Sequence, residues 1–483
     1  MNMSEYAAII PMLIVALSGM AAMLAEAFRQ PGERMPIAGL GLIGLTGAAV
    51  ASVFLWDSDA RSFGVVRSDN FALFTNLVLC VVGILTMLFS NEVVERENLP
   101  SGEYYALTLF SICGMMLMAA ANDLLLIFLA LEVLSLSVYV LTGIRRASAA
   151  GAEAAFKYFL LGAFSSAFFL YGIAFTFAVT EGSTRLDAVA IALSAQGAGA
   201  PSTLTLLAVG FLAVGFAFKI SAVPFHMWTP DAYEGAPTVV TAFMSTGVKA
   251  AAFAAFVRVF LYALEPLQGQ WVPVLSAIAA VTMIVGTVVG VVQSNVKRML
   301  AYSSIAHAGY LLLGVIANSP MNNHGKAAVL FYLLTYAVSN LGALGIVALL
   351  GTPQHQHDEL RDFAGLWRSR PGLATLMAIF LLSLGGFPPT AGFIAKWYIF
   401  SAAVQEQHYW LAIIGVLTSV ISVFFYLRIV VMMYMTEGVE AIRPRVPAAA
   451  MAGLALATAA VFYLGVLPTR VLDLAFDSIT TIF

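Results

Sequence analysis

Long apolar segments alternate with short polar connections along almost the whole chain. Most of these segments have about twenty residues, which is enough for a helix to cross a hydrocarbon layer of about 30 Å. Because a backbone inside lipid has to satisfy its own hydrogen bonds, the segments are expected to be helices. The pattern predicts fourteen of them, at residues 6–26, 36–56, 71–90, 104–120, 123–143, 154–180, 204–230, 238–262, 271–293, 297–317, 326–350, 372–403, 408–434 and 447–467.

The composition is that of an integral membrane protein. Of the 483 residues, 61% are hydrophobic and 10% are charged, and the mean hydropathy is +0.92. The two cysteines, Cys80 and Cys113, form no C-x-x-C motif, so the sequence predicts neither an iron–sulfur centre nor a zinc site in this chain. No glycine motif for phosphate or dinucleotide binding occurs, and nothing in the charge pattern indicates nucleic acid binding.

Basic residues are unevenly shared between the connections. The odd-numbered connections hold Arg29, Arg34, Arg96, Arg145, Arg146, Lys297, Arg298, Arg361, Arg368, Arg370, Arg443 and Arg445. The even-numbered connections hold Arg61, Arg67, Arg185 and Lys326. Because cytoplasmic loops are enriched in basic residues, the odd connections are predicted in the cytoplasm and both termini on the periplasmic side.

Two predicted helices combine a lysine with a signal for a helix break. Lys219 lies well inside the segment 204–230, and Pro224 follows it. Proline removes a backbone donor and clashes with the preceding turn, so the helix is expected to kink or break there. The motif GGFPPTAG at 385–392 predicts a second break, and Lys396 lies just beyond it. Broken helices at mid-membrane commonly line a polar, water-accessible cavity.

Four ionisable residues are predicted near the middle of helices: Glu132, Lys219, Lys249 and Lys396. Placing one charged side chain at the membrane centre costs about 2.5–3.5 kcal/mol, so such a set indicates a use. Burial disfavours a charged ammonium and a nearby carboxylate favours it, so the set can bind and release protons. Sodium would need oxygen ligands, which three lysines do not supply. The pattern favours a proton relay, and ion pairs that only hold helices together are the alternative.

Further polar residues accompany this set. His226 and His307 are candidate bridges in the relay, because imidazole exchanges protons near neutral pH, and packing roles are the alternative. Asp231 and Glu234 follow the first break and are expected to cap and shape the turn into the next helix. Arg258 is expected near a helix end, with its side chain reaching toward the membrane surface.

An internal repeat organises the predicted helices. The segment YFLLGAFSSA at 158–167 resembles YLLTYAVSNL at 332–341. Nearly the same offset pairs the polar residues, Glu132 with His307 and Lys219 with Lys396. A unit of five helices is odd-numbered, so the second copy is inverted across the membrane, as in many transporters. The predicted domains are 1–100 with three helices, a first repeat at 104–265, an inverted repeat at 270–435, and a C-terminal helix within 440–483.

Three long motifs carry a family resemblance. They are KISAVPFHMWTPDAYEGAPTVVTAFMSTGVKAAAF at 219–253, VKRMLAYSSIAHAGYLLLG at 296–314 and GGFPPTAGFIAKWYIFSAAV at 385–404. Together they resemble the antiporter-like membrane subunits of respiratory complex I, the proton-pumping NADH:quinone oxidoreductase, and most closely the subunit N type. The resemblance covers roughly residues 70–435. Lys396 separates this chain from the similar subunit M, which usually carries Glu at that position.

The resemblance implies an all-α polytopic membrane protein with two inverted five-helix repeats, breaks in helices 7 and 12, and a proton relay of Glu132, Lys219, Lys249 and Lys396. It implies no cofactor in this chain, with NAD, FMN, iron–sulfur clusters and quinone in partner subunits. Subunit M and the small subunits K and J are the expected neighbours in a bacterial inner membrane. A subunit of a multi-subunit cation/proton antiporter is the alternative function, and a membrane scaffold is a second alternative.

Overall fold

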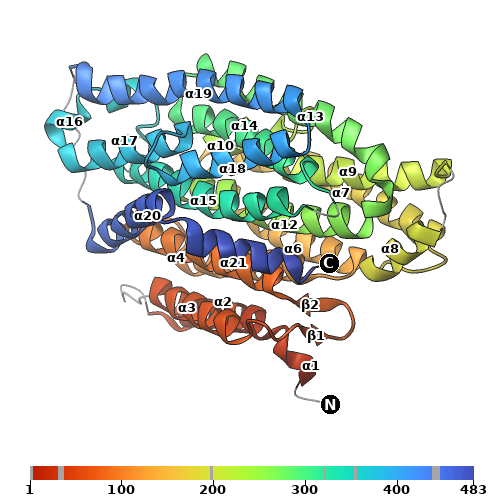
Figure 1. Cartoon of the computed structure of the whole chain (residues 1–483). Coiled ribbons are helices and arrows are strands. Elements are labelled where there is room, and N and C mark those ends of the chain that lie inside the picture. Colours follow the sequence, from red (N-terminus) through yellow and green to blue (C-terminus); the bar gives the residue numbers. More distant parts are fainter. Residues whose placement is uncertain are drawn as a thin grey trace.

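The computed structural model describes residues 4–30, 37–195, 200–319, 322–352, 356–437 and 446–482. In these ranges the chain is almost entirely helical (Figure 1). One short antiparallel hairpin, formed by β1 (Ala60–Ser62) and β2 (Val66–Ser68), follows the first helices. The N-terminal helices are α1 (Ser4–Ala7), α2 (Ile10–Phe28), α3 (Ile37–Phe54) and α4 (Asn70–Arg96).

Two halves follow, each with one broken helix. The first half contains α5 (Ser101–Ala120), α6 (Leu124–Thr142), α7 (Ala149–Val179), α8 (Leu186–Ala195), α9 (Thr203–Lys219), α10 (Trp228–Gly235), α11 (Thr238–Phe243), the π-helix η1 (Met244–Val248), α12 (Lys249–Arg258) and the π-helix η2 (Val259–Ala263). The second half contains the 3₁₀ turn η3 (Glu265–Leu267), α13 (Gln268–Val291), α14 (Val296–Ile316), α15 (His324–Leu350), the 3₁₀ turn η4 (Leu360–Phe363), α16 (Leu366–Ser369), α17 (Pro371–Gly385), α18 (Ala391–Gln405) and α19 (Tyr409–Met435). The chain closes with α20 (Ala448–Val466) and α21 (Thr469–Thr480).

Within the described ranges, twelve continuous helical segments are long and apolar enough to cross a membrane. The two remaining predicted spans are the broken ones, α9 with α10 and α17 with α18. The fold class inferred from the sequence, a polytopic all-α membrane protein with breaks in its seventh and twelfth spans, is therefore confirmed. The short helices α8 and α21 were not predicted, because they are too short to give a membrane-spanning signal.

The helices of the two halves pack in the same order. In the first half α5 packs on α6, α6 on α7, and α7 on both α9 and α10. In the second half α13 packs on α14, α14 on α15, and α15 on both α17 and α18. This matching order supports the predicted repeat, whose boundaries at 104–265 and 270–435 stay a prediction.

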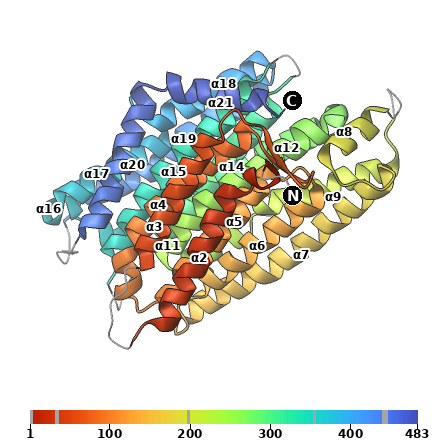
Figure 2. The ribbon, with the colours of Figure 1, turned by 90° about the horizontal axis from the view of Figure 1, so that it is seen from below.

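The centre of the bundle is the part most thoroughly removed from lipid. Residues 238–263 and nearly all of α14 and α15 are buried, whereas α2, α7 and α20 are mostly exposed. Figure 2 shows α7 and α9 along the outer edge, with α14 and α15 among other helices. Buried helices can carry polar side chains that a lipid-facing helix cannot.

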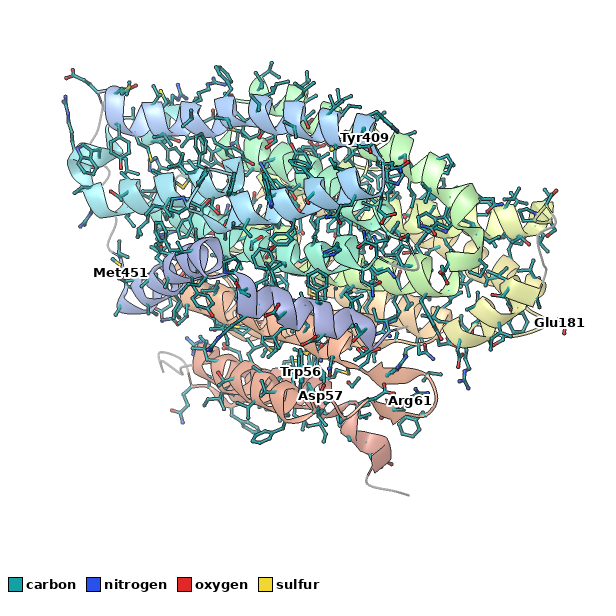
Figure 3. The ribbon with its side chains drawn as sticks, in the orientation of Figure 1. Trp56, Asp57, Arg61, Glu181, Tyr409 and Met451 are labelled. Atoms are coloured by element: carbon teal, nitrogen blue, oxygen red, sulfur yellow. The ribbon has the colours of Figure 1, made fainter. Side chains whose placement is uncertain are left out.

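Connections alternate between the two ends of the bundle. Glu181 and Arg61 lie toward one end, and Met451, near the start of α20, lies toward the other (Figure 3). Both ends of the described chain meet the β-hairpin, because Ser68 Oγ donates to the Ala8 carbonyl at 2.8 Å and Arg67 Nη2 donates to the Thr481 carbonyl at 2.8 Å. The two ends therefore lie on the same side of the bundle.

Arg258 does not reach toward the membrane surface, and that prediction is wrong. Its side chain is 1% exposed and forms two parallel bonds with Asp69, Nη1 to Oδ2 at 2.9 Å and Nη2 to Oδ1 at 2.8 Å. Arg258 Nε also donates to the Ala119 carbonyl at 3.0 Å, and Asp69 caps α4 by accepting from Ala72 N. The pair joins residues 189 positions apart, so no local sequence pattern indicates it.

We expect Asp69→Ala to destabilise the protein strongly, because it leaves the Arg258 guanidinium buried without its partner, at a cost of about 3–5 kcal/mol. The measurement is the thermal unfolding midpoint and the yield of purified protein. Glu437→Ala is the control, since Glu437 pairs with Arg368 at the surface, where both side chains are largely exposed, and such surface pairs contribute about 0–1 kcal/mol. Equal losses in the two variants would contradict this account of the buried pair.

Candidate functional site

The first helix break places Lys219 in the protein interior. α9 ends at Lys219, the chain turns through residues 220–227, and α10 begins at Trp228. Lys219 is 3% exposed, and its Nζ donates to Ser135 Oγ on α6 at 2.7 Å. The ammonium also lies 5.9 Å and 5.7 Å from the ring centroids of Tyr139 and Tyr158. Aromatic faces at this distance attract a cation without supplying a counter-charge.

The second break produces a related site around Lys396. α17 ends at Gly385, Gly386 takes a positive φ of 87°, and α18 begins at Ala391. Lys396 Nζ donates to the Gly385 carbonyl at 3.0 Å and to Ser419 Oγ on α19 at 2.9 Å.

The two lysines lie on different half-helices of their broken helices. Lys219 is the last residue of α9, whereas Lys396 lies on α18 and reaches back to the last carbonyl of α17. The C-terminal end of a helix carries a partial negative charge, which favours a cation. The second break therefore stabilises the Lys396 ammonium at the C-terminal end of α17, whereas the Lys219 ammonium is bonded to Ser135 on α6.

Lys249 lies between these two sites at the start of α12, directly after the π-helix η1. It is 2% exposed, and its Nζ donates to both the carbonyl and the hydroxyl of Ser304, the latter at 2.5 Å. The Tyr336 ring centroid lies 5.3 Å from the same ammonium. Single-turn π segments inside α-helices are frequent at functional sites.

His307 connects the surroundings of Lys249 and Lys396. Its Nδ1 is hydrogen bonded to the Tyr332 hydroxyl at 2.6 Å, and its Nε2 to the Tyr426 hydroxyl at 3.1 Å. The imidazole ring also lies 5.0 Å from the ring of Tyr336 and 5.7 Å from the ring of Tyr310. Tyr336 contacts Lys249, and the Tyr310 ring lies 5.4 Å from Lys396 Nζ. The histidine is thus one aromatic side chain away from each lysine.

Glu132 lies on α6, three residues before the serine that binds Lys219. It accepts a hydrogen bond from Ser166 Oγ on α7 at 2.5 Å. Among the described residues, none of the ion pairs involves Lys219, Lys249 or Lys396. The glutamate and the lysines are therefore near one another in the fold without forming a salt bridge.

Aromatic side chains fill the space between the first break and the centre. The Tyr158 ring stacks on Trp228 with centroids 4.1 Å apart, and Trp228 meets Tyr233 at 6.2 Å. His226 lies in the turn before Trp228 and is half-buried. No hydrogen bond or ring contact in the described part of the chain joins His226 to the lysines, so its place in a relay stays a prediction.

Asp231 and Glu234 do not act as helix caps, and that prediction is wrong. Both lie within α10 and pair with Arg298 Nη1, at 2.8 Å and 2.7 Å, at the start of α14. Asp231 also pairs with Lys157 of α7 at 2.9 Å, and Lys157 pairs with Glu153 at 2.7 Å. These charges hold α10 to α7 and α14, which the sequence could not indicate because the partners come from distant helices.

Several hydroxyl-bearing residues of the site were missed in the sequence: Ser135, Tyr158, Ser166, Tyr332, Tyr336, Ser419 and Tyr426. The alignment of the two copies of the internal repeat indicates some of these residues. The offset that pairs Glu132 with His307 also pairs Ser135 with Tyr310, and Tyr158 aligns with Tyr332. Both residues of each pair contact the site.

A membrane protein with two broken helices and a buried lysine beside each break has the architecture of an antiporter-like membrane subunit. A family model described as "NADH:quinone oxidoreductase/Mrp antiporter, TM" matches residues 121–422. The chain belongs to this family, and within it to the NADH-quinone oxidoreductase subunit N group, the antiporter-like membrane subunits of respiratory complex I.

The relatives agree over nearly the full chain. NADH-quinone oxidoreductase subunit N of Trichlorobacter lovleyi is 45% identical over 476 residues, covering 98% of this chain and 97% of the relative. A chain of respiratory complex I from Thermus thermophilus with bound aureothin is 34% identical, with a TM-score of 0.80 over 96% of this chain and 99% of that one. A chain of the Mrp complex from Dietzia has a TM-score of 0.84 at 20% identity, covering 100% of this chain and 98% of that one, which shows a shared fold.

These findings confirm the sequence-based identification as a membrane subunit of proton-pumping NADH:quinone oxidoreductase. Within the ranges that the structure describes, no group of three or more His, Cys, Asp or Glu side chains could hold a metal ion. The site consists of lysine, histidine and hydroxyl side chains together with Glu132.

We expect Gly386→Ala to impair the second break. An added Cβ would lie 3.0 Å from Lys396 Cδ, and the positive φ costs a non-glycine residue about 1–2 kcal/mol. Lys396 would be pushed from the Gly385 carbonyl, so NADH-driven proton uptake by membrane vesicles should fall. Gly372→Ala on α17 is the control, because no atom lies within 4 Å of its added Cβ. Normal proton uptake by an assembled Gly386→Ala complex would contradict this interpretation.

Proposed function

We propose that this chain moves protons within NADH:quinone oxidoreductase along a row of side chains, the half-buried Glu132 and the buried Lys219, Lys249, His307 and Lys396. One observation carries the proposal. The three lysines are 2–4% exposed and are hydrogen bonded to neutral hydroxyl or carbonyl oxygens. An ammonium held only to lock helices together would be expected to bind a carboxylate, because an unpaired buried charge is costly.

Neutral partners suit a group that has to release its proton. Ser135, Ser304 and Ser419 each accept a hydrogen bond from one lysine, and a hydroxyl can accept and donate at the same time. The faces of the tyrosine rings attract the ammonium, but they do not hold the proton on the lysine as a carboxylate would. Each lysine can therefore alternate between charged and neutral states at modest cost.

His307 is the proposed bridge in the second half. Its two ring nitrogens are bonded to two different tyrosine hydroxyls, Tyr332 and Tyr426. Neutral imidazole accepts a proton at one nitrogen and donates from the other, so it can pass a proton across the ring. The tautomer follows from which hydroxyl donates. In this proposal, His307 is the proton-exchanging group between Lys249 and Lys396.

Buried polar atoms with unused bonding capacity lie beside the row. Among the described side chains, the Tyr158 hydroxyl, the Tyr336 hydroxyl and Asn340 Oδ1 lack a hydrogen-bond partner in the protein. Buried groups of this kind usually bind ordered water, which can complete a hydrogen-bonded path. Tyr158 contacts Lys219 and Tyr336 contacts Lys249, so water at these hydroxyls would extend a hydrogen-bonded path beside each of the two lysines.

The energy for transport has to come from partner subunits. Moving one proton against about 150 mV costs about 3.5 kcal/mol, which side-chain rearrangement in this chain does not supply. We propose that NAD, FMN, iron–sulfur clusters and quinone are bound by those partners, and that charge changes there act on Glu132 and the lysines. Subunits M, K and J are the proposed neighbours.

The proposed orientation has both ends of the chain on the periplasmic side of a bacterial inner membrane. The excess of Lys and Arg in the odd-numbered connections supports it. The contacts of Ala8 and Thr481 with the same hairpin agree with two ends on one side.

We expect Lys219→Ala to leave the complex assembled but to reduce proton pumping strongly, because a positioned proton-transfer group contributes about 10²–10⁴-fold to the rate of its step. The measurement is NADH-driven proton uptake by proteoliposomes containing purified complex. Lys219→Arg is the matched variant, because arginine keeps the positive charge but does not release its proton. It should pump as poorly as the alanine variant.

Other outcomes would support the alternatives. Normal pumping by Lys219→Arg, with loss of assembly in Lys219→Ala, would indicate a scaffold whose buried charges only hold helices. Sodium-dependent transport by this chain without an NADH-oxidising partner would favour a cation/proton antiporter, whose fold the Dietzia chain shares.

A further inference from the structure

We propose that Ser166 on α7 is a positioning residue that holds Glu132 away from Lys219. The proposal rests on the proton relay above and deepens it. It assigns a role to a hydroxyl that lies outside the relay itself and is bonded to its acidic member.

Glu132 and Lys219 each form a hydrogen bond with a serine and form no ion pair with each other. Ser166 Oγ donates to Glu132 Oε1 at 2.5 Å, and Lys219 Nζ donates to Ser135 Oγ at 2.7 Å. Ser135 lies one helical turn beyond Glu132, so both project from the same side of α6. An ammonium and a carboxylate close together in a low-dielectric interior attract strongly, so a separated pair requires competing bonds. The two serines supply those bonds.

A small cavity lies between Ser166 and Lys219. Its volume is about 10 Å³, and its lining includes both residues together with Tyr139 and Ser165. This is about the size of one water molecule, so a neutral molecule can occupy the space beside Lys219 while Glu132 is bonded to Ser166.

The Ser166 hydroxyl therefore sets which of two states is populated. With Glu132 bound to Ser166, Lys219 is bonded to a neutral hydroxyl and can release its proton. With Glu132 turned to Lys219, the ion pair holds the proton on the lysine. Removing the Ser166 hydroxyl favours the second state, and each turnover then has to separate a buried ion pair.

The test uses the complete complex in proteoliposomes and measures the rate of NADH-driven proton uptake. We expect Ser166→Ala to lower this rate about tenfold, as expected when a hydrogen bond to a charged group is lost. Ser166→Thr keeps the hydroxyl and should restore most of the rate. Ser137→Ala is the matched control, because Ser137 bonds only to the Val133 carbonyl of its own helix.

A double variant separates positioning from general damage. If Ser166 acts through Glu132, Ser166→Ala should cause no further loss in a Glu132→Gln background. An equal loss in both backgrounds, or no recovery with threonine, would overturn the proposal. If Ser166→Ala does not assemble, Ser166→Cys provides the same test, because a thiol is a weaker donor of similar size.

The outcomes also distinguish this proposal from the relay. Normal pumping by Ser166→Ala, with defective pumping by Glu132→Gln and Lys219→Ala, would refute the positioning role alone. Normal pumping by Glu132→Gln and Lys219→Ala would refute the relay itself.

Discussion

The cost of placing an ammonium inside a membrane is the constraint on which this structure depends. A lysine can be kept there only if surrounding groups replace water. The protein does this with helix-end carbonyls, serine hydroxyls and aromatic faces around Lys219, Lys249 and Lys396. These partners are neutral, so they stabilise the charge without fixing it. The same constraint explains why the lysines lie near the most deeply buried helices and away from the lipid-facing surface.

The broken helices follow from this requirement. A continuous helix uses its carbonyls internally, whereas a helix that ends at mid-membrane offers free carbonyls at its C-terminus. α17 ends at the carbonyl that binds Lys396, whereas α9 ends at Lys219 itself, whose ammonium is bonded to Ser135 of α6. The ion pairs of Asp231 and Arg298 hold the second half of the first broken helix in place. Two breaks related by the repeat therefore create two cation sites, with Lys249 between them.

The helices, the breaks and the charged residues of the site could be predicted from the sequence, whereas contacts between distant residues could not. The lengths of the apolar segments and the positions of proline and glycine predict the helices and both breaks, because these features are local in the sequence. Buried charge identified Glu132 and the three lysines. The Arg258–Asp69 pair could not be predicted, because its two residues are far apart in the chain and neither is unusual locally. Ser166 was missed for a similar reason, since a serine in a helix carries no signal until its partner is known.

The most direct test of the central claim is the number of protons translocated per NADH oxidised by assembled complex carrying Lys249→Met. Lys249 joins the two halves, and methionine has a similar length without a titratable group. The account predicts that this ratio falls, or that coupled turnover stops, while the complex remains assembled. An unchanged ratio at unchanged turnover would show that protons do not pass through this row of lysines.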